Sequence, residues 1–153
     1  MHLSSDVIKT LQGKTLVTAE SCTGGGIGAA LTAISGSSAV YKGGVISYTN
    51  QIKESLLGVP AEMLEKYGAV SEPVAQEMAV GARKALQADI AVSVTGLAGP
   101  GGDEFGNPVG TVFIGYADDK KSYARKCHFA GDREAVRNQA ICTALQMILE
   151  ENK

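Results

Sequence analysis

Glycine is concentrated at two places in this sequence, and each place follows a run of residues typical of a buried strand. Of the 19 glycines, four lie in Gly24–Gly28 and six in Gly96–Gly110. Thr15–Ala19 precedes the first cluster, and Asp89–Thr95 precedes the second. Short runs rich in β-branched residues favour strands, and glycine after such a run marks a turn or a loop. The chain is therefore expected to alternate strands with turns and helices, which is typical of an α/β fold.

The remaining segments fit the same alternation. Further strands are predicted over Gly44–Tyr48, Gly110–Tyr116 and Ser122–Phe129, the last two forming a hairpin. Helical spacing of apolar residues predicts helices over Ser4–Leu11, from Gly24 to Leu31, between Pro60 and Gly68, over Pro73–Gln87, and after a capping Asp132. One more short helix is expected between the second strand and Pro60.

Length and composition indicate one domain. The chain has 153 residues, 44% of them hydrophobic, and shows no internal repeat or low-complexity linker. A chain of this size forms a single core. The prediction is one α/β domain over residues 1–153, with a mixed sheet of about five strands and helices on both faces, a three-layer α/β/α arrangement.

Charge and cysteine content exclude several function classes. A net charge of −2 gives no broad cationic surface for nucleic acid. The sequence has neither a secretory signal nor an apolar stretch long enough to span a membrane, so a cytoplasmic location is expected. Cys22, Cys127 and Cys142 have no CxxC spacing, and the two histidines lie far apart, so no metal site is expected.

Ligands of open α/β sheets gather beyond the carboxyl ends of strands. Three junctions qualify here: Ala19–Gly25, Tyr48–Lys53 and Thr95–Asp103. At the first, glycines before a helix leave N–H groups for a phosphate or an oxyanion, or simply form a tight turn. Gly24–Ala29 also fits a loose dinucleotide motif, but the acidic residue that would bind the ribose is missing, which disfavours that function.

Ser21 is the candidate nucleophile, because it lies where a helix is expected to begin. A serine hydroxyl needs a base, and neither His2 nor His128 is well placed for a Ser-His-Asp triad. A lysine with a lowered pKa can replace histidine, and a tyrosine can relay the proton. Tyr48 ends the second predicted strand and Lys53 lies in the helix expected after it, so both can face Ser21, although each is also compatible with a surface role. Cys22 is a rival nucleophile that would likewise need a base.

Two later segments are candidates for ligand contacts. The long loop from Gly96 to Pro108 is rich in glycine and proline, which in a small domain favours a binding role. Arg133 and Arg137 lie in the first turns of the last helix and are candidates to hold a phosphate or to remain solvated.

Several motifs, taken together, resemble a known family. They are Ala19–Gly25, Gly36–Ser38, Tyr48–Asn50 with Lys53, Gly68–Glu72, Thr95–Pro100, Pro108–Thr111 and Gly131–Arg133. In this order and spacing, from about Thr15 to the last helix, they resemble the nicotinamide mononucleotide deamidases. These enzymes are stand-alone relatives of the C-terminal domain of the competence/damage-inducible protein CinA.

The resemblance implies hydrolysis of the carboxamide of nicotinamide mononucleotide to nicotinate mononucleotide and ammonia, for return to NAD synthesis. It implies a metal-independent amidohydrolase without a cofactor, with Ser21 as nucleophile and Lys53 and Tyr48 handling protons. It also suggests a homodimer. With the junctions above, it gives these expected substrate contacts: Cys22, Thr23, Gly24, Gly25, Ser38, Thr95, Gly96, Gly99, Arg133 and Arg137.

Several alternatives stay open at this point. Either Lys53 or Tyr48 can be the immediate base, and the backbone N–H groups near Cys22 to Gly25, at the Gly24–Gly28 helix start, can hold the oxyanion or the phosphate. Either arginine can contact the phosphate, and the range of pyridine nucleotides accepted is open. The alternative functions are a non-catalytic nucleotide-binding module and an interaction module that works with a CinA-like partner.

Overall fold

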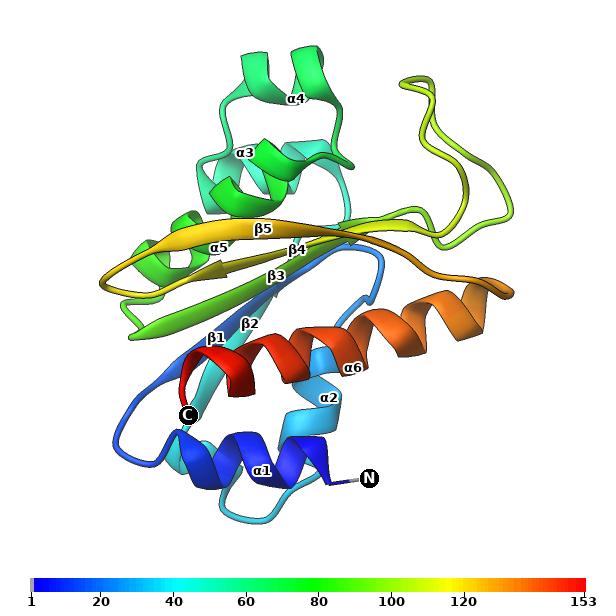
Figure 1. Cartoon of the computed structure of the whole chain (residues 1–153). Helices are drawn as coiled ribbons and strands as arrows, with labels where there is room; N and C mark the ends of the chain where they lie inside the picture. Colours follow the sequence, from blue (N-terminus) through cyan, green and yellow to red (C-terminus); the bar gives the residue numbers. More distant parts are fainter. Residues whose placement is uncertain (1) are drawn as a thin grey trace.

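A five-stranded sheet forms the centre of the protein in the computed structural model, which describes residues 2–153 (Figure 1). The strands are β1 (Leu16–Glu20), β2 (Tyr41–Ile46), β3 (Ile90–Gly96), β4 (Thr111–Ala117) and β5 (Ser122–His128), in the spatial order β2-β1-β3-β4-β5. β1 pairs in parallel with β2 and β3, whereas β3–β4 and β4–β5 are antiparallel. The predicted mixed sheet and its hairpin are confirmed.

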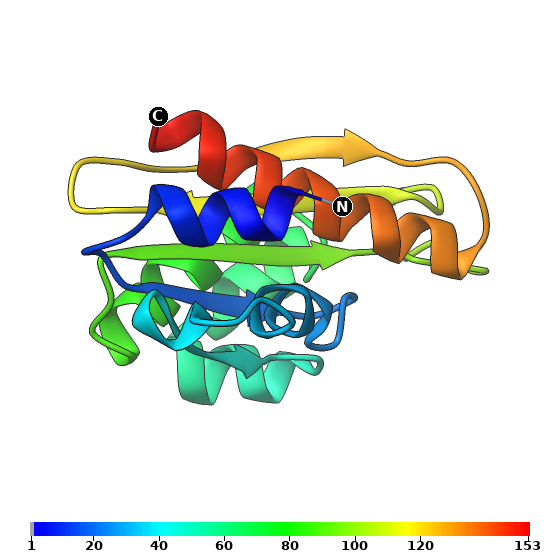
Figure 2. The same cartoon turned by 90° about the horizontal axis from the view of Figure 1, so that it is seen from below.

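Helices cover both faces of this sheet. On one face lie α1 (Leu3–Thr10), α2 (Gly26–Thr32) and α6 (Arg133–Glu151), and on the other α3 (Asn50–Leu57), α4 (Ala61–Tyr67) and α5 (Glu72–Ala85) (Figure 1). Figure 2 looks onto the first face, where α1 and α6 lie side by side. The predicted three-layer arrangement is confirmed. Within residues 2–153, no helix combines the length and apolar character needed to cross a membrane.

The central strands divide their side chains between two cores. On β3, Val92 and Val94 pack in the core that includes Leu145 of α6, while Ala91 packs in the core that includes Met78 of α5. Both faces of β3 are therefore buried, which explains its nearly continuous apolar run. A strand held from both sides is a rigid support for the loop that follows it.

The second strand differs from its predicted bounds. The sequence predicts Gly44–Tyr48, whereas β2 spans Tyr41–Ile46 and follows a short 3₁₀ turn, η1 (Ser37–Ala39). The chain leaves the sheet early because Thr49 caps α3, its side chain accepting a hydrogen bond from the Ile52 N–H at 3.4 Å. Tyr48 consequently lies in the connection between strand and helix.

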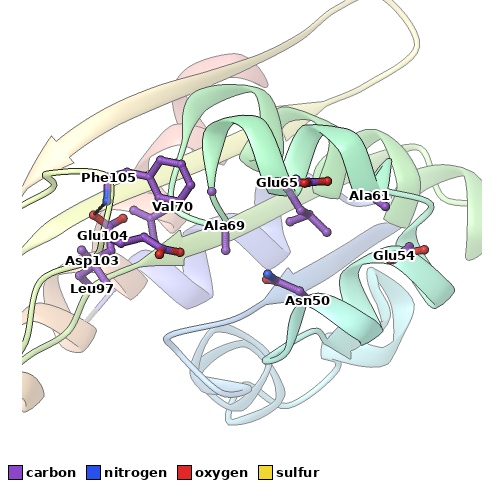
Figure 3. A pocket seen from close by; sticks show the side chains of 12 residues that line it. Asn50, Glu54, Ala61, Glu65, Ala69, Val70, Leu97, Asp103, Glu104 and Phe105 are labelled. Atoms are coloured by element: carbon purple, nitrogen blue, oxygen red, sulfur yellow. Dashed lines mark hydrogen bonds between the residues drawn. The ribbon is translucent and has the colours of Figure 1, made fainter.

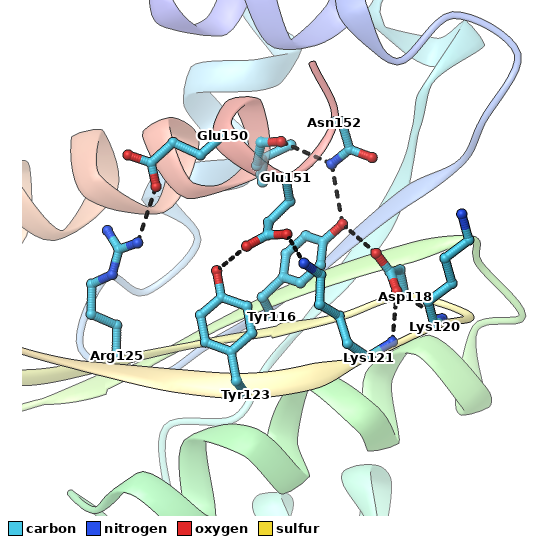
Figure 4. Close-up of polar contacts among 10 residues, drawn as sticks. Tyr116, Asp118, Lys120, Lys121, Tyr123, Arg125, Glu150, Glu151 and Asn152 are labelled. Atoms are coloured by element: carbon cyan, nitrogen blue, oxygen red, sulfur yellow. Dashed lines mark hydrogen bonds and ion pairs between the residues drawn. The ribbon is translucent and has the colours of Figure 1, made fainter.

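Polar contacts tie the end of α6 to the β4–β5 hairpin (Figure 4). The Tyr116 hydroxyl donates to Asp118 Oδ2 at 2.9 Å and accepts from Asn152 Nδ2 at 3.1 Å. Tyr123 donates to Glu151, which also pairs with Lys121. This network lies at the amino-terminal end of β3, so it is separated from the carboxyl ends of the parallel strands by the length of the sheet.

Candidate active site

Ser21 lies on the turn directly after β1, at the carboxyl ends of the parallel strands. Its N–H donates to the Val94 carbonyl at 3.0 Å, which extends the ladder between β1 and β3 by one residue. Its own carbonyl accepts from the Gly24 N–H at 3.0 Å, closing the turn. The Ser21 hydroxyl thus projects from a backbone whose N–H and carbonyl groups are both hydrogen-bonded.

Lys53 reaches Ser21 from the first turns of α3. Its Nζ lies 3.1 Å from Ser21 Oγ, 2.7 Å from the Ser47 carbonyl oxygen and 3.4 Å from the Tyr48 carbonyl oxygen. Only 1% of Lys53 is exposed, and no carboxylate of the described residues contacts its Nζ. A lysine so placed has only neutral partners.

Burial is the main influence on the charge of this lysine. Removing an ammonium from water favours the neutral amine, and here burial, partly opposed by Cys22, lowers the pKa of Lys53 to about 8. A neutral amine has two N–H donors and one lone pair. The Ser47 and Tyr48 carbonyls accept both donors, so the lone pair is left toward the Ser21 hydroxyl. This geometry suits proton transfer from serine to lysine.

Cys22, the rival nucleophile, has the opposite environment. Its side chain is buried in the core beside α6, and burial raises the pKa of the thiol to about 11. A thiol with so high a pKa is uncharged near neutral pH and is a weak nucleophile. The geometry therefore favours Ser21 over Cys22.

The start of α2 is occupied by a side chain of the protein itself. The carboxylate of Glu20 accepts from Thr23 Oγ1 and the Ile27 N–H, both at 2.8 Å, and from the Gly28 N–H at 3.0 Å. A substrate anion therefore finds no free donor at the Ile27 and Gly28 amides, which lie beyond the Cys22–Gly25 amides of the prediction. The physical reason is that Glu20, whose role the sequence reasoning missed, already supplies the negative charge.

Three other amides of the turn remain. Among residues 2–153, the N–H groups of Cys22, Thr23 and Gly25 donate to no other residue. The residue after a nucleophilic serine often supplies an oxyanion donor from its backbone. The Cys22 N–H occupies that position relative to Ser21.

The pocket around Ser21 has a volume of about 310 Å³. Eight of the predicted site residues line it: Ser21, Cys22, Tyr48, Lys53, Thr95, Gly96, Gly99 and Arg133. Its other lining residues are Ala69, Val70, Leu97, Ala98 and Gly101. The pocket thus gathers all three predicted junctions, as expected for the carboxyl edge of such a sheet.

Five predicted contacts do not line the pocket: Thr23, Gly24, Gly25, Ser38 and Arg137. The buried Thr23 side chain binds Glu20, and the two following glycines have positive φ angles. Ser38 lies exposed in η1, before β2, whereas the pocket lies beyond the other end of that strand. The structure therefore does not bring Ser38 to Ser21 within one chain.

The two arginines have different surroundings. Arg137 donates to the Cys22 carbonyl from Nε at 3.0 Å and to the Thr23 carbonyl from Nη2 at 3.1 Å. It therefore joins α6 to the turn that carries Ser21. Arg133 is exposed at the mouth of the pocket, where Nη1 donates to the Gly99 carbonyl at 2.7 Å. Arg133 therefore has guanidinium donors available to a ligand.

Tyr48 lies at the same mouth. Its side chain is 59% exposed, and its hydroxyl lies 3.4 Å from Arg133 Nη2. No described contact joins this hydroxyl to Ser21 or Lys53; the Tyr48 carbonyl contacts Lys53 instead. The geometry therefore favours Lys53 as the immediate base.

A second pocket, of about 610 Å³, adjoins the first (Figure 3). The two share Ala69, Val70 and Leu97 as lining residues. The side chains that face this second pocket from α3, α4 and the loop after β3 include four carboxylates and no basic group: Glu54, Glu65, Asp103 and Glu104. Its charge disfavours a phosphate, so an anionic end of a ligand is expected on the Arg133 side.

The model of the CinA C-terminal domain family matches residues 2–152. The nicotinamide-nucleotide amidohydrolase PncC of Escherichia coli K12 is 47% identical over 154 residues, covering 99% of this chain and 93% of the relative. A CinA-like protein of Parasynechococcus marenigrum is 50% identical over 151 residues, covering 95% of this chain but 36% of that longer protein.

A solved structure agrees with the fold. The crystal structure of a competence-damaged protein (CinA) superfamily member from Escherichia coli superposes with a TM-score of 0.95 at 40% identity. The match covers 97% of this chain and 88% of the other.

Proposed function

Because the chain belongs to the CinA C-terminal domain family, we propose that it is a nicotinamide-nucleotide amidohydrolase. It hydrolyses the carboxamide of nicotinamide mononucleotide to nicotinate mononucleotide and ammonia, which returns the pyridine ring to NAD synthesis. A relative named for nicotinamide-nucleotide hydrolysis is 47% identical over nearly the whole chain. The observation that carries the proposal is the 3.1 Å contact between Ser21 Oγ and the buried Lys53 Nζ.

The first half of the reaction forms an acyl-enzyme. Neutral Lys53 accepts the hydroxyl proton of Ser21 as Oγ attacks the carboxamide carbon, and the carbonyl electron pair moves onto oxygen. When the tetrahedral intermediate collapses, the C–N bond breaks. The Lys53 ammonium returns its proton to the departing nitrogen, which leaves as ammonia. An ester of Ser21 and a neutral lysine remain.

The second half repeats the same proton transfers with water. Lys53 accepts a proton from a water molecule as that water attacks the ester carbon. Collapse then breaks the bond to Ser21 Oγ, and Lys53 returns the proton to the serine. The product carboxylate is released, and the enzyme regains its starting state.

The oxyanion of both intermediates is assigned to the backbone after Ser21. The Cys22 N–H donates to no other residue within residues 2–153, and it follows the proposed nucleophile directly. The helix start beyond it is closed by Glu20. For this part of the turn, the proposal is therefore the oxyanion and not the phosphate.

The phosphate of the substrate is assigned to Arg133. Its guanidinium is exposed at the mouth of the pocket, whereas that of Arg137 is engaged by two carbonyl groups. The acidic neighbouring pocket leaves this side as the favourable one for an anion. Arginine suits the role because it binds phosphate through several donors at once.

The test is ammonia release from nicotinamide mononucleotide, nicotinamide riboside and free nicotinamide. We expect the mononucleotide to be the best substrate, and Ser21→Ala and Lys53→Met each to lower the rate by about 1,000-fold or more. Cys22→Ala, which removes the adjacent thiol, is the matched control and keeps most of the activity. Binding of the mononucleotide without ammonia release would instead favour a non-catalytic binding module.

A cytoplasmic location and a homodimer belong to the same proposal. Of the two, the homodimer comes from the family resemblance. Light scattering coupled to gel filtration tests the dimer, and a monomer at working concentrations would contradict it.

A further inference from the structure

Glu20 is a buried anion next to the proposed nucleophile. Only 2% of it is exposed, and no lysine, arginine or histidine of the described residues contacts its carboxylate. A buried carboxylate without a cation is costly unless hydrogen bonds compensate for the lost water. The burial of the Glu20 carboxylate therefore needs a reason other than side-chain packing.

Its side chain determines the shape of the turn that carries Ser21. Three donors converge on the carboxylate: Thr23 Oγ1, the Ile27 N–H and the Gly28 N–H. The carboxylate thus connects the end of β1 to the first turn of α2, with Ser21 between them. The negative charge at a helix N-terminus is also electrostatically favourable.

Its main chain leads to the proposed base. The Glu20 carbonyl accepts from the Ser47 N–H at 2.8 Å, and the Ser47 carbonyl in turn contacts Lys53 Nζ at 2.7 Å. The same residue therefore anchors the turn of the serine through its side chain and the acceptor of the lysine through its backbone. A shift of Glu20 changes the Ser21–Lys53 distance from both ends.

We propose that Glu20 is a positioning residue of the amide hydrolysis. The inference rests on the proposed function, in which Ser21 attacks and Lys53 takes the proton. Glu20 touches neither substrate nor the reacting atoms; it holds the two groups that do so at hydrogen-bond distance. Small misplacements of reacting groups lower rates strongly, by about 100-fold for 1 Å.

Two substitutions separate positioning from charge. Glu20→Gln keeps the length and one oxygen, which still accepts from Thr23 and Ile27, but it turns an NH₂ group toward the Gly28 N–H. Glu20→Ala removes all three bonds. Positioning predicts a graded loss of kcat, about 10-fold for Gln and about 100-fold for Ala, with KM changed by less than about threefold. A role for the charge itself predicts equal losses in both variants.

The control for lost stability is Tyr116→Phe. It removes a buried hydroxyl with two hydrogen bonds from the far end of the sheet (Figure 4). Thermal unfolding is measured for all three variants beside kcat per folded molecule. We expect Tyr116→Phe to lose stability and keep kcat. If the Glu20 variants also keep kcat and only unfold earlier, Glu20 is structural and the proposal is wrong.

A second readout does not depend on the natural substrate. A fluorophosphonate modifies activated serines, and mass spectrometry measures its rate of addition to Ser21. We expect slower addition in Glu20→Gln and slower still in Glu20→Ala. Wild-type labelling without ammonia release from the mononucleotide would contradict the proposed function alone, with the Glu20 series still read from labelling. Equal labelling rates in all variants, or no labelling and no ammonia release by the wild type, would overturn the positioning role.

Discussion

The chemistry of the pocket depends on how one lysine is surrounded. Lys53 is buried beside backbone carbonyls and a serine hydroxyl, and it has no carboxylate to hold its proton. Histidine is the usual base near neutral pH, and lysine serves only where its pKa is lowered. Here burial produces that change.

The activity is expected to rise with pH through a midpoint near 8. The pKa of Lys53 is lowered from 10.5 to about 8, so below pH 8 the amine is protonated and has no lone pair for Ser21. Above pH 8 the neutral form predominates, and the rate levels off. The measurement is kcat/KM for ammonia release from pH 6 to 10, which reports the free enzyme. A rate independent of pH across this range would exclude Lys53 as the base.

Tyr48→Phe is expected to keep kcat within about threefold of wild type, because the hydroxyl contacts Arg133 and not the Ser21–Lys53 pair. The backbone carbonyl that contacts Lys53 is unchanged in this variant. Steady-state kinetics with nicotinamide mononucleotide provide the measurement. A loss of 100-fold in kcat would instead favour the proton relay that the family resemblance implies.

Arg133→Ala is expected to raise KM for the mononucleotide by about 10-fold or more, because it removes the exposed guanidinium at the pocket mouth. KM for the riboside, which lacks the phosphate, should change little. Arg137→Ala is the contrasting variant: it removes support for the Cys22 and Thr23 carbonyls and should lower kcat for both substrates. Equal changes for both substrates in Arg133→Ala would place the phosphate elsewhere.

At the scale of elements, the position of α3 sets the distance between base and nucleophile. This helix packs on α5, and the contact is close at Gly81, where an added Cβ would overlap the Leu57 carbonyl at the end of α3. The atoms that this Cβ would meet are backbone atoms of Leu57, which cannot move aside without moving α3. The approach of α3 to the sheet therefore depends on this glycine.

Gly81→Ala is expected to destabilise the protein by about 1–3 kcal/mol and to lower kcat, because α3 must move away and take Lys53 with it. Denaturant unfolding and ammonia release measure the two effects. Lys84→Ala, an exposed change on the same helix, is the control and should affect neither. A stable Gly81→Ala enzyme with full activity would show that the helices can adjust without moving the lysine.

The elements also show how far the sequence could predict this protein. The strand Asp89–Thr95 was predicted within one residue of β3, since an apolar run buried on both faces has a strong pattern. The predicted second strand was shifted toward the C-terminus relative to β2. Glycines at positions 43 and 44 weaken the strand pattern, and the cap at Thr49 moves the helix start. Residues near strand ends could be assigned to the pocket from their positions along the chain alone, because ligands of such sheets bind beyond the carboxyl ends of the strands.

Contacts within the turn could not be assigned in that way. Glu20 reaches residues seven and eight positions ahead, and Arg137 returns to the turn from the last helix. Such partners depend on three-dimensional placement, which spacing does not reveal. Ser38 was expected at the site from the family resemblance; within one chain it lies before β2, whereas the pocket lies beyond the other end of that strand.

At the scale of the whole molecule, stability and chemistry are separated along the sheet. The pocket lies at the carboxyl ends of β1 and β3, while the network of Tyr116, Asp118 and Asn152 lies at the opposite end (Figure 4). β4 spans the distance between them. Changes to that network should therefore affect folding without affecting the reaction.

Tyr116→Phe is expected to lower the free energy of unfolding by about 1–2 kcal/mol, because Asp118 and Asn152 each lose a partner. The rate of ammonia release per folded molecule should stay at the wild-type value. Denaturant titration and steady-state kinetics provide the two numbers. A fall in kcat without loss of stability would indicate coupling between the two ends of the sheet.

The burial of Lys53 among neutral partners makes the charge of the substrate part of the reaction. A nicotinamide ring joined to ribose is a pyridinium cation, and a cation entering the pocket repels an ammonium more than a neutral amine. The bound nucleotide would therefore favour the reactive form of Lys53, as a nearby carboxylate would not. Free nicotinamide is uncharged and would not favour the neutral form of Lys53 in this way. Under the proposed function, preference for the nucleotide would thus have two sources, the phosphate assigned to Arg133 and the ring charge near Lys53.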